Sequence, residues 1–190
     1  MAIDRRDFIK RALAGATLQL AVEISGGIFL LTPQQARAQG VALGQLSERE
    51  ARTLEHLAEG LLPGATEAGV IHFIDNQLGV SADDCMLIAK YFEVTPPYAQ
   101  FYRAGVNACD LLAKRRFKTE VHRLSPENLV EFLQVIGNPE TPVEDGYPLS
   151  LFYLCLRSDA VDVVYGTPQG FEKLNVPYMA HIMPPEGWNV

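Results

Sequence analysis

The chain has 190 residues, with 16 Lys or Arg against 23 Asp or Glu, so its formal net charge is -7. This balance disfavours binding to nucleic acid or to anionic lipid, because such binding depends on clustered Lys and Arg. A hydrophobic content of 48% and a charged content of 21% are typical of a globular protein rather than of a disordered one.

The N-terminal segment has the layout of a secretory signal. An apolar run from Ala12 to Thr32 follows a charged head and leads to Ala36-Arg37-Ala38. The head resembles a twin-arginine signal, an address that a bacterial export receptor reads on folded cargo. The residues that carry this resemblance are Arg5, Arg6, Phe8 and Lys10. Because signal segments are not part of the mature domain, residues 1–38 are set aside in predicting the fold.

Two other interpretations of this segment are a membrane span and an ordinary amphipathic helix. The 20 residues from Ala12 to Leu31 are long enough to cross a bilayer. However, Glu23 would lie near the middle of the span, where a carboxylate costs about 2.5 kcal/mol or more. The export signal is therefore favoured, and residues 39–190 are predicted to form one domain.

The first half of this domain contains signals for three helices. Ser47-Glu48-Arg49-Glu50 has the form of a capping box, and the apolar period that follows ends at Pro63-Gly64. After a loop over residues 64–69, the same period predicts a second helix from Val70 to Leu78. Ser81 is expected to cap a third helix. Its buried face should carry Leu87, Ile88, Tyr91 and Phe92.

The second half contains signals for three more helices. A long helix should begin after Pro96-Pro97 and form the central packing element, with Lys114-Arg115-Arg116 favourably placed near its C-terminal end. Ser125-Pro126 marks the start of a helix that ends at Gly137. The segment from Leu149 to Leu156 is either a buried helix or a core strand, and its helical neighbours favour a helix.

We find no sustained alternation and no Asn-Gly turn from which a sheet could be predicted. The fold class is therefore all-α, a compact multi-helix single domain. From about residue 158 the sequence mixes Pro, Gly and aromatic residues, which cannot continue a helix but are too apolar for a free tail. This irregular C-terminal extension should lie on a surface, either of this domain or of a partner.

The three cysteines, Cys85, Cys109 and Cys155, each lie in an apolar stripe, and none belongs to a C-x-x-C pair. They are predicted to be buried packing residues, because free Cys is among the most buried residue types. A single disulfide remains possible, and in an oxidising compartment the odd cysteine would be unpaired or bonded to another chain.

Signatures of phosphate loops, hydrolases and zinc proteases are absent from the sequence. His56 and His122 are interpreted as solvated residues on helix surfaces or ends. The cluster from Met179 through His181 to Met183 offers thioether and imidazole groups that bind copper or haem iron, although packing against a partner explains it better. Without a C-x-x-C-H motif, this chain does not itself attach c-type haem.

Two stretches resemble the small third subunit of bacterial gluconate 2-dehydrogenase complexes. The first contains Leu61-Leu62-Pro63-Gly64, Ala68-Gly69-Val70 and Phe73-Ile74-Asp75. The second runs from Val164 to Phe171 and from Val176 to Ile182, with Trp188 behind it. The chain lacks the Gly-Gly-Asn loop found in many members of the wider family, so the resemblance does not fix a substrate.

The resemblance implies a periplasmic complex associated with the inner membrane. In it, a flavoprotein subunit that carries FAD oxidises a sugar or sugar acid, and a multihaem cytochrome c subunit that carries haem c passes electrons to quinone. The small subunit has no catalytic residues and no cofactor of its own. It would escort the flavoprotein to the export receptor and stabilise it, touching the membrane only through the complex or a retained signal segment.

The C-terminal extension is predicted to bind the flavoprotein, since aromatic and methionine side chains are enriched at interfaces. The residues predicted to contact the flavoprotein are Tyr165, Phe171, Tyr178, Met179, His181, Met183 and Trp188. Two alternatives stay open. One is a free-standing periplasmic enzyme or metal-binding protein that uses His181, Met179 and Met183, with Asp162 or Tyr165. The other is a structural protein anchored by its signal segment.

Overall fold

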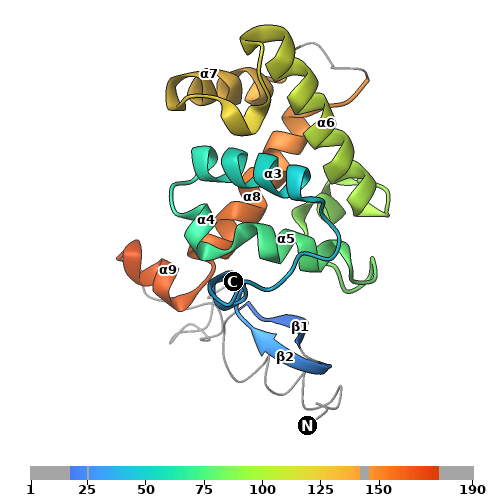
Figure 1. The fold of residues 1–190 in the computed structure, drawn as a ribbon, viewed down its shortest axis with the longest axis vertical. Helices are drawn as coiled ribbons and strands as arrows, with labels where there is room; N and C mark the ends of the chain where they lie inside the picture. Colours follow the sequence, from blue (N-terminus) through green and yellow to red (C-terminus); the bar gives the residue numbers. More distant parts are fainter. Residues whose placement is uncertain (1–17, 25, 142–145, 176–190) are drawn as a thin grey trace, which may run out of the picture.

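The computed structural model describes residues 18–24, 26–141 and 146–175 (Figure 1). These residues form eight α-helices, two short 3-10 helices and one two-stranded sheet, which confirms the all-α class. The elements in chain order are β1 (Leu20–Ile24), β2 (Gly27–Leu31), α2 (Pro33–Ala38), α3 (Glu48–Leu61), α4 (Ala65–Ala68), α5 (Val70–Leu78), η1 (Ile88–Phe92), α6 (Tyr98–Phe117), η2 (Val121–Arg123), α7 (Pro126–Gly137), α8 (Leu149–Tyr165) and α9 (Pro168–Lys173).

Helix α8 lies at the centre of the molecule, with the other helices around it (Figure 1). It packs against α3, α4, α5, α6, α7, α9 and η1. The expectation that α6 is the central helix was wrong, because α6 keeps one exposed polar side, whereas α8 begins with a segment that is apolar almost all round. Gly105 of α6 lets the two helices meet, since a Cβ there would lie 2.3 Å from the buried Phe152 ring.

The predicted helix starts are confirmed where the signal is local. Ser47 and Glu50 form the reciprocal capping box of α3, in which the Ser47 N–H donates to Glu50 Oε2 at 2.8 Å. Asn128 N–H donates to Ser125 Oγ at the start of α7, and α6 begins directly after Pro97. The segment from Leu149 is a helix, as its neighbours suggested. Within the described ranges, we find no helix with the length and apolarity that a bilayer crossing requires.

The third predicted helix is not present in that form. The chain after Ser81 makes a turn and then the short η1, and Tyr91 and Phe92 are 70% and 40% exposed rather than buried. Side chains from distant elements take the amides that a helix would use. Met86 N–H donates to Gln77 Oε1 at 2.8 Å, and Ile88 N–H donates to Asp159 Oδ1 at 2.9 Å.

The C-terminal stretch is also more regular than predicted. Helix α8 continues through Val161 to Tyr165, and α9 follows after a short break. Burial of Ala160, Val163 and Val164 against the domain maintains the helical period beyond residue 158. The chain then restarts because Thr167 caps α9, accepting the Gly170 N–H at 3.1 Å.

The segment that was set aside from the fold prediction contains ordered structure between residues 18 and 38. Strands β1 and β2 pair in antiparallel register, with Leu20 opposite Leu31, around a tight turn at Gly26, whose φ is 79°. Helix α2 follows and packs against α4 and α5. The loop predicted over residues 64–69 contains the short α4. The small sheet formed by β1 and β2 was not predicted, because the sequence contains no Asn-Gly turn signal.

Candidate partner-binding surface

A groove of about 450 Å³ lies where α2, α4, the end of α8 and α9 meet. Of these elements, α2 and α9 lie on the far side of α3 and α4 from α7 (Figure 1). Gly170 allows α9 to approach α8, because a Cβ there would lie 2.5 Å from the Val164 carbonyl oxygen. The residues that line the groove are Thr32, Pro33, Gln34, Gln35, Gly64, Glu67, Ala68, Val163, Val164, Thr167, Gly170 and Lys173.

The described part of the predicted partner-binding stretch borders this groove. Tyr165 ends α8 and Phe171 lies in α9, both partly exposed, and their neighbours Val164 and Gly170 line the groove. Asp162 is exposed on the last turns of α8. The other predicted contacts, Tyr178, Met179, His181, Met183 and Trp188, lie outside the described residues, as do the signal residues Arg5, Arg6, Phe8 and Lys10.

Buried carboxylates elsewhere in the domain hold backbone and side-chain donors. Asp159 of α8 accepts hydrogen bonds from the Ile88 N–H and from the Tyr102 hydroxyl. Burial raises the pKa of Asp159 to about 7, although both hydrogen bonds act in the opposite direction. Burial together with the neighbouring carboxylate also raises the pKa of Tyr102 well above its usual value. This pair joins α6, α8 and η1 inside the core.

Asp75 of α5 supports the chain that leads into α3. Its carboxylate accepts the N–H groups of Gly44, Gln45 and Leu46, each at 2.8 Å. Amides bonded in this way to a charged acceptor are strong local restraints. Asp75 therefore fixes the connection between the N-terminal layer and the helical domain.

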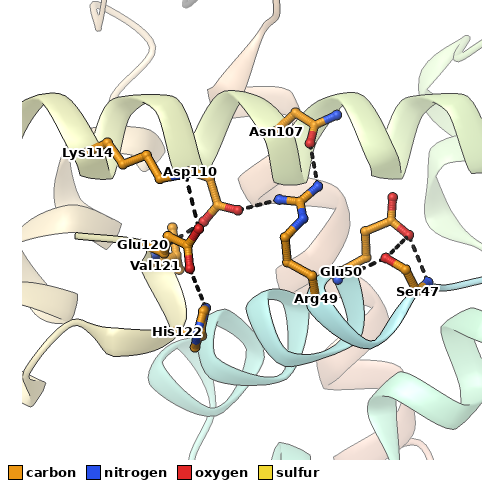
Figure 2. A network of polar contacts seen from close by, with 9 residues as sticks. All are labelled: Ser47, Arg49, Glu50, Asn107, Asp110, Lys114, Glu120, Val121 and His122. Atoms are coloured by element: carbon orange, nitrogen blue, oxygen red, sulfur yellow. Dashed lines mark hydrogen bonds and ion pairs between the residues drawn. The ribbon is translucent and has the colours of Figure 1, made fainter. Parts of the chain in front are cut away.

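Asp110 connects α3, α6 and η2 (Figure 2). It accepts from Arg49 Nη1 at 2.6 Å and from the Val121 N–H at 3.1 Å, while Arg49 Nη2 donates to Asn107 at 2.7 Å. At the edge of this network, Lys114 Nζ lies 3.0 Å from Glu120, and this contact lowers the pKa of Glu120. The network joins α3, α6 and η2, and each oxygen of the Asp110 carboxylate accepts a hydrogen bond within it.

Comparison with known proteins assigns the chain to a family. Residues 48–183 match the model of gluconate 2-dehydrogenase subunit 3. The chain belongs to this family. The match begins at the first residue of α3 and continues beyond α9, so it covers the domain built around α8 and leaves the hairpin and α2 outside. No curated protein and no solved structure gives a match.

The cysteines of this family member are packing residues, as predicted. Cys85, Cys109 and Cys155 are all buried and free. Burial raises the pKa of each thiol, to about 12 for Cys155, so the thiols remain protonated at neutral pH. Within the described residues, no three His, Cys, Asp or Glu side chains are grouped so that they could hold a metal ion.

One prediction about polar residues in this subunit needs correction, and one group of polar residues was missed. His56 and His122 are partly buried rather than solvated, and His56 Nε2 lies 3.2 Å from the Leu124 carbonyl oxygen. The structural carboxylates Asp75, Asp110 and Asp159 were not singled out from the sequence. A usable signal exists for Asp159, which is an isolated carboxylate on the same apolar helical stripe as Cys155, Leu156 and Val163.

Proposed function

We propose that this chain is the non-catalytic small subunit of a periplasmic dehydrogenase complex associated with the inner membrane. Its partners are a flavoprotein that oxidises a sugar or sugar acid and a multihaem cytochrome c, and these subunits carry FAD and haem c. The chain escorts the flavoprotein through twin-arginine export and stabilises it. The family match over residues 48–183 is the observation that carries this proposal.

The hydrogen bonds that the buried carboxylates accept support an accessory role. Asp75, Asp110 and Asp159 each accept hydrogen bonds from backbone amides, and two of them also bind a side chain of another element. An acid or base in catalysis needs access to a substrate proton, which a carboxylate enclosed by such donors does not have. These groups stabilise the fold.

We assign the groove between α2, α4, α8 and α9 to the flavoprotein. The stretch that resembles the family's C-terminal signature begins at Val164 in the groove wall, so the contact predicted from the sequence is continuous with the groove.

Purification from the membrane fraction tests this function. The full chain carries an affinity tag, its bound proteins are identified by mass spectrometry, and visible spectra are recorded for the complex and for the chain alone. We expect a flavoprotein and a cytochrome c in the bound fraction, with flavin and haem absorbance in the complex only. Stoichiometric absorbance of the isolated chain would instead indicate the metal-binding alternative.

A further inference from the structure

The Ala36-Arg37-Ala38 triplet, which has the form of a signal-cleavage site, is folded into the domain. Ala36 is 0% exposed and lies within α2. Its N–H donates to the Thr32 carbonyl at 2.9 Å and its carbonyl accepts the Val41 N–H at 3.0 Å. The bond after Ala38 is also held, because the Gln39 N–H donates to the Gln35 carbonyl at 3.0 Å.

The hairpin before α2 is fixed to α5 by apolar and polar contacts. Leu20 is 1% exposed, and β1 packs against α5. Asn76 Nδ2 of α5 donates to the Ala21 carbonyl at 2.9 Å. Strand β1, α5 and the chain over residues 41–45 line an open pocket of about 370 Å³.

Gly69 shows how closely α2 fits the helical domain. It has a φ of 80°, and a Cβ at this position would lie 2.2 Å from the Pro33 carbonyl oxygen. The first residue of α2 therefore rests directly on the backbone between α4 and α5. One turn further along α2, Arg37 Nε lies 3.8 Å from Glu55 of α3.

We propose that residues 18–38 are a permanent layer of the working protein, and that the Ala36-Arg37-Ala38 triplet is not its processing site. Proteases cut backbone that is exposed and able to leave the fold, whereas the backbone of this triplet is hydrogen-bonded within α2 and Ala36 is buried. Resting on the proposed function, one consequence is that the flavoprotein groove needs this layer, because Thr32 to Gln35 form one of its walls.

The first test is the intact mass of the chain recovered from the membrane fraction, measured for the wild type and for Ala38→Asp. Ala38 is exposed, so this substitution leaves the fold unchanged but would block cleavage at an Ala-x-Ala site. We expect both proteins to retain residues 18–38 and to have the same N-terminus. A wild type that starts at Gln39, beside a longer Ala38→Asp protein, would overturn the proposal.

The second test is thermal unfolding of full-length variants, which does not depend on export. Ala36→Asp should lower the melting temperature by about 5 °C or more, because it buries a charge, while Ala38→Asp leaves it unchanged. Where Ala36→Asp fails to fold, Leu20→Ala is compared with Ile28→Ala, since Ile28 is 57% exposed in the same hairpin. Equal melting temperatures within these pairs would show that the layer is not part of the fold, whatever the outcome of the co-purification.

Discussion

Asp159 is a carboxylate placed where its charge is disfavoured. Burial raises its pKa to about 7, against an ordinary value of 3.8. The folded protein therefore holds this proton at pH values where the unfolded chain has lost it. The stability from this group is fully present below pH 3.8 and is lost as the pH rises through about 7. At about 1.4 kcal/mol per pKa unit, the loss is on the order of 4 kcal/mol.

We therefore expect the free energy of unfolding to fall between pH 5 and pH 8 in the wild type. Asp159→Asn imitates the protonated acid, so its free energy of unfolding should fall less over this range. Urea titrations of both proteins check this, and the difference between them removes the contribution of the ionisable groups that the two proteins share. Identical pH dependence would mean that Asp159 is ionised in the fold.

Gly105 is a second single position on which the core depends. Gly105→Ala places a methyl group against the Phe152 ring and should destabilise the fold by about 1 to 3 kcal/mol, despite the better helix propensity of Ala. Gly44→Ala is the control, because its added Cβ meets nothing within 4 Å. A urea midpoint for Gly105→Ala at or above that of the wild type would contradict the close contact.

At the scale of elements, Asp75 orders the chain between α2 and α3. Asp75→Ala removes the acceptor of three amides, so we expect a loss of about 2 kcal/mol or more and faster hydrogen exchange at Gly44, Gln45 and Leu46. Asp83→Ala, at an exposed aspartate, is the control and should change neither quantity. Unchanged exchange at the three amides would contradict the role of Asp75.

The elements that could be predicted from sequence are those fixed by neighbouring residues. Ser47, Pro97 and Ser125 begin helices through their own side chains or ring, so a few residues of sequence are sufficient. Segment 81–92 was predicted wrongly because Gln77 and Asp159 take its amides from a distance. The ordered part of segment 1–38 was missed because an apolar hairpin has the same composition as the apolar part of a signal.

The candidate surface was predictable only in part. Tyr165 and Phe171, whose aromatic character suggested partner contacts, lie beside residues that line the groove, and their role as contacts stays a prediction. The wall formed by Thr32 to Gln35 was not visible, because it depends on α2 folding back onto α4 and α5. Such a contact between distant segments has no local sequence signal.

At the scale of the whole molecule, the groove should bind the flavoprotein. Gln34→Arg places a larger charged side chain in the groove wall and should weaken binding about tenfold without changing the melting temperature. Gln134→Arg makes the same change on α7, at the other end of the molecule (Figure 1). Competition binding with the purified flavoprotein measures both variants. Equal affinity of the two variants for the flavoprotein would show that the interface lies outside the groove.

Export of the complex should depend on the paired arginines. Arg5→Lys together with Arg6→Lys is expected to leave the chain folded but to keep it, and the flavoprotein, in the cytoplasm, because Lys does not imitate the guanidinium groups. Arg11→Lys is the matched control and should be exported normally. Cell fractionation checks both. If the flavoprotein still reached the periplasm in cells that produce only the double variant, the proposed escort role would be contradicted.

The central place of α8 has a consequence for synthesis. Among the described helices only the short α9 leaves the ribosome after α8, yet α3, α5, α6 and α7 all pack against α8. Until Tyr165 has emerged, the helix that these four helices share as a packing partner is incomplete. At about 5 to 20 residues per second, synthesis from α3 to the end of α8 takes several seconds or more, and the core cannot be completed before then. The protein therefore completes its fold only after nearly all of the chain has been made, an order of events that suits the export of folded cargo proposed above.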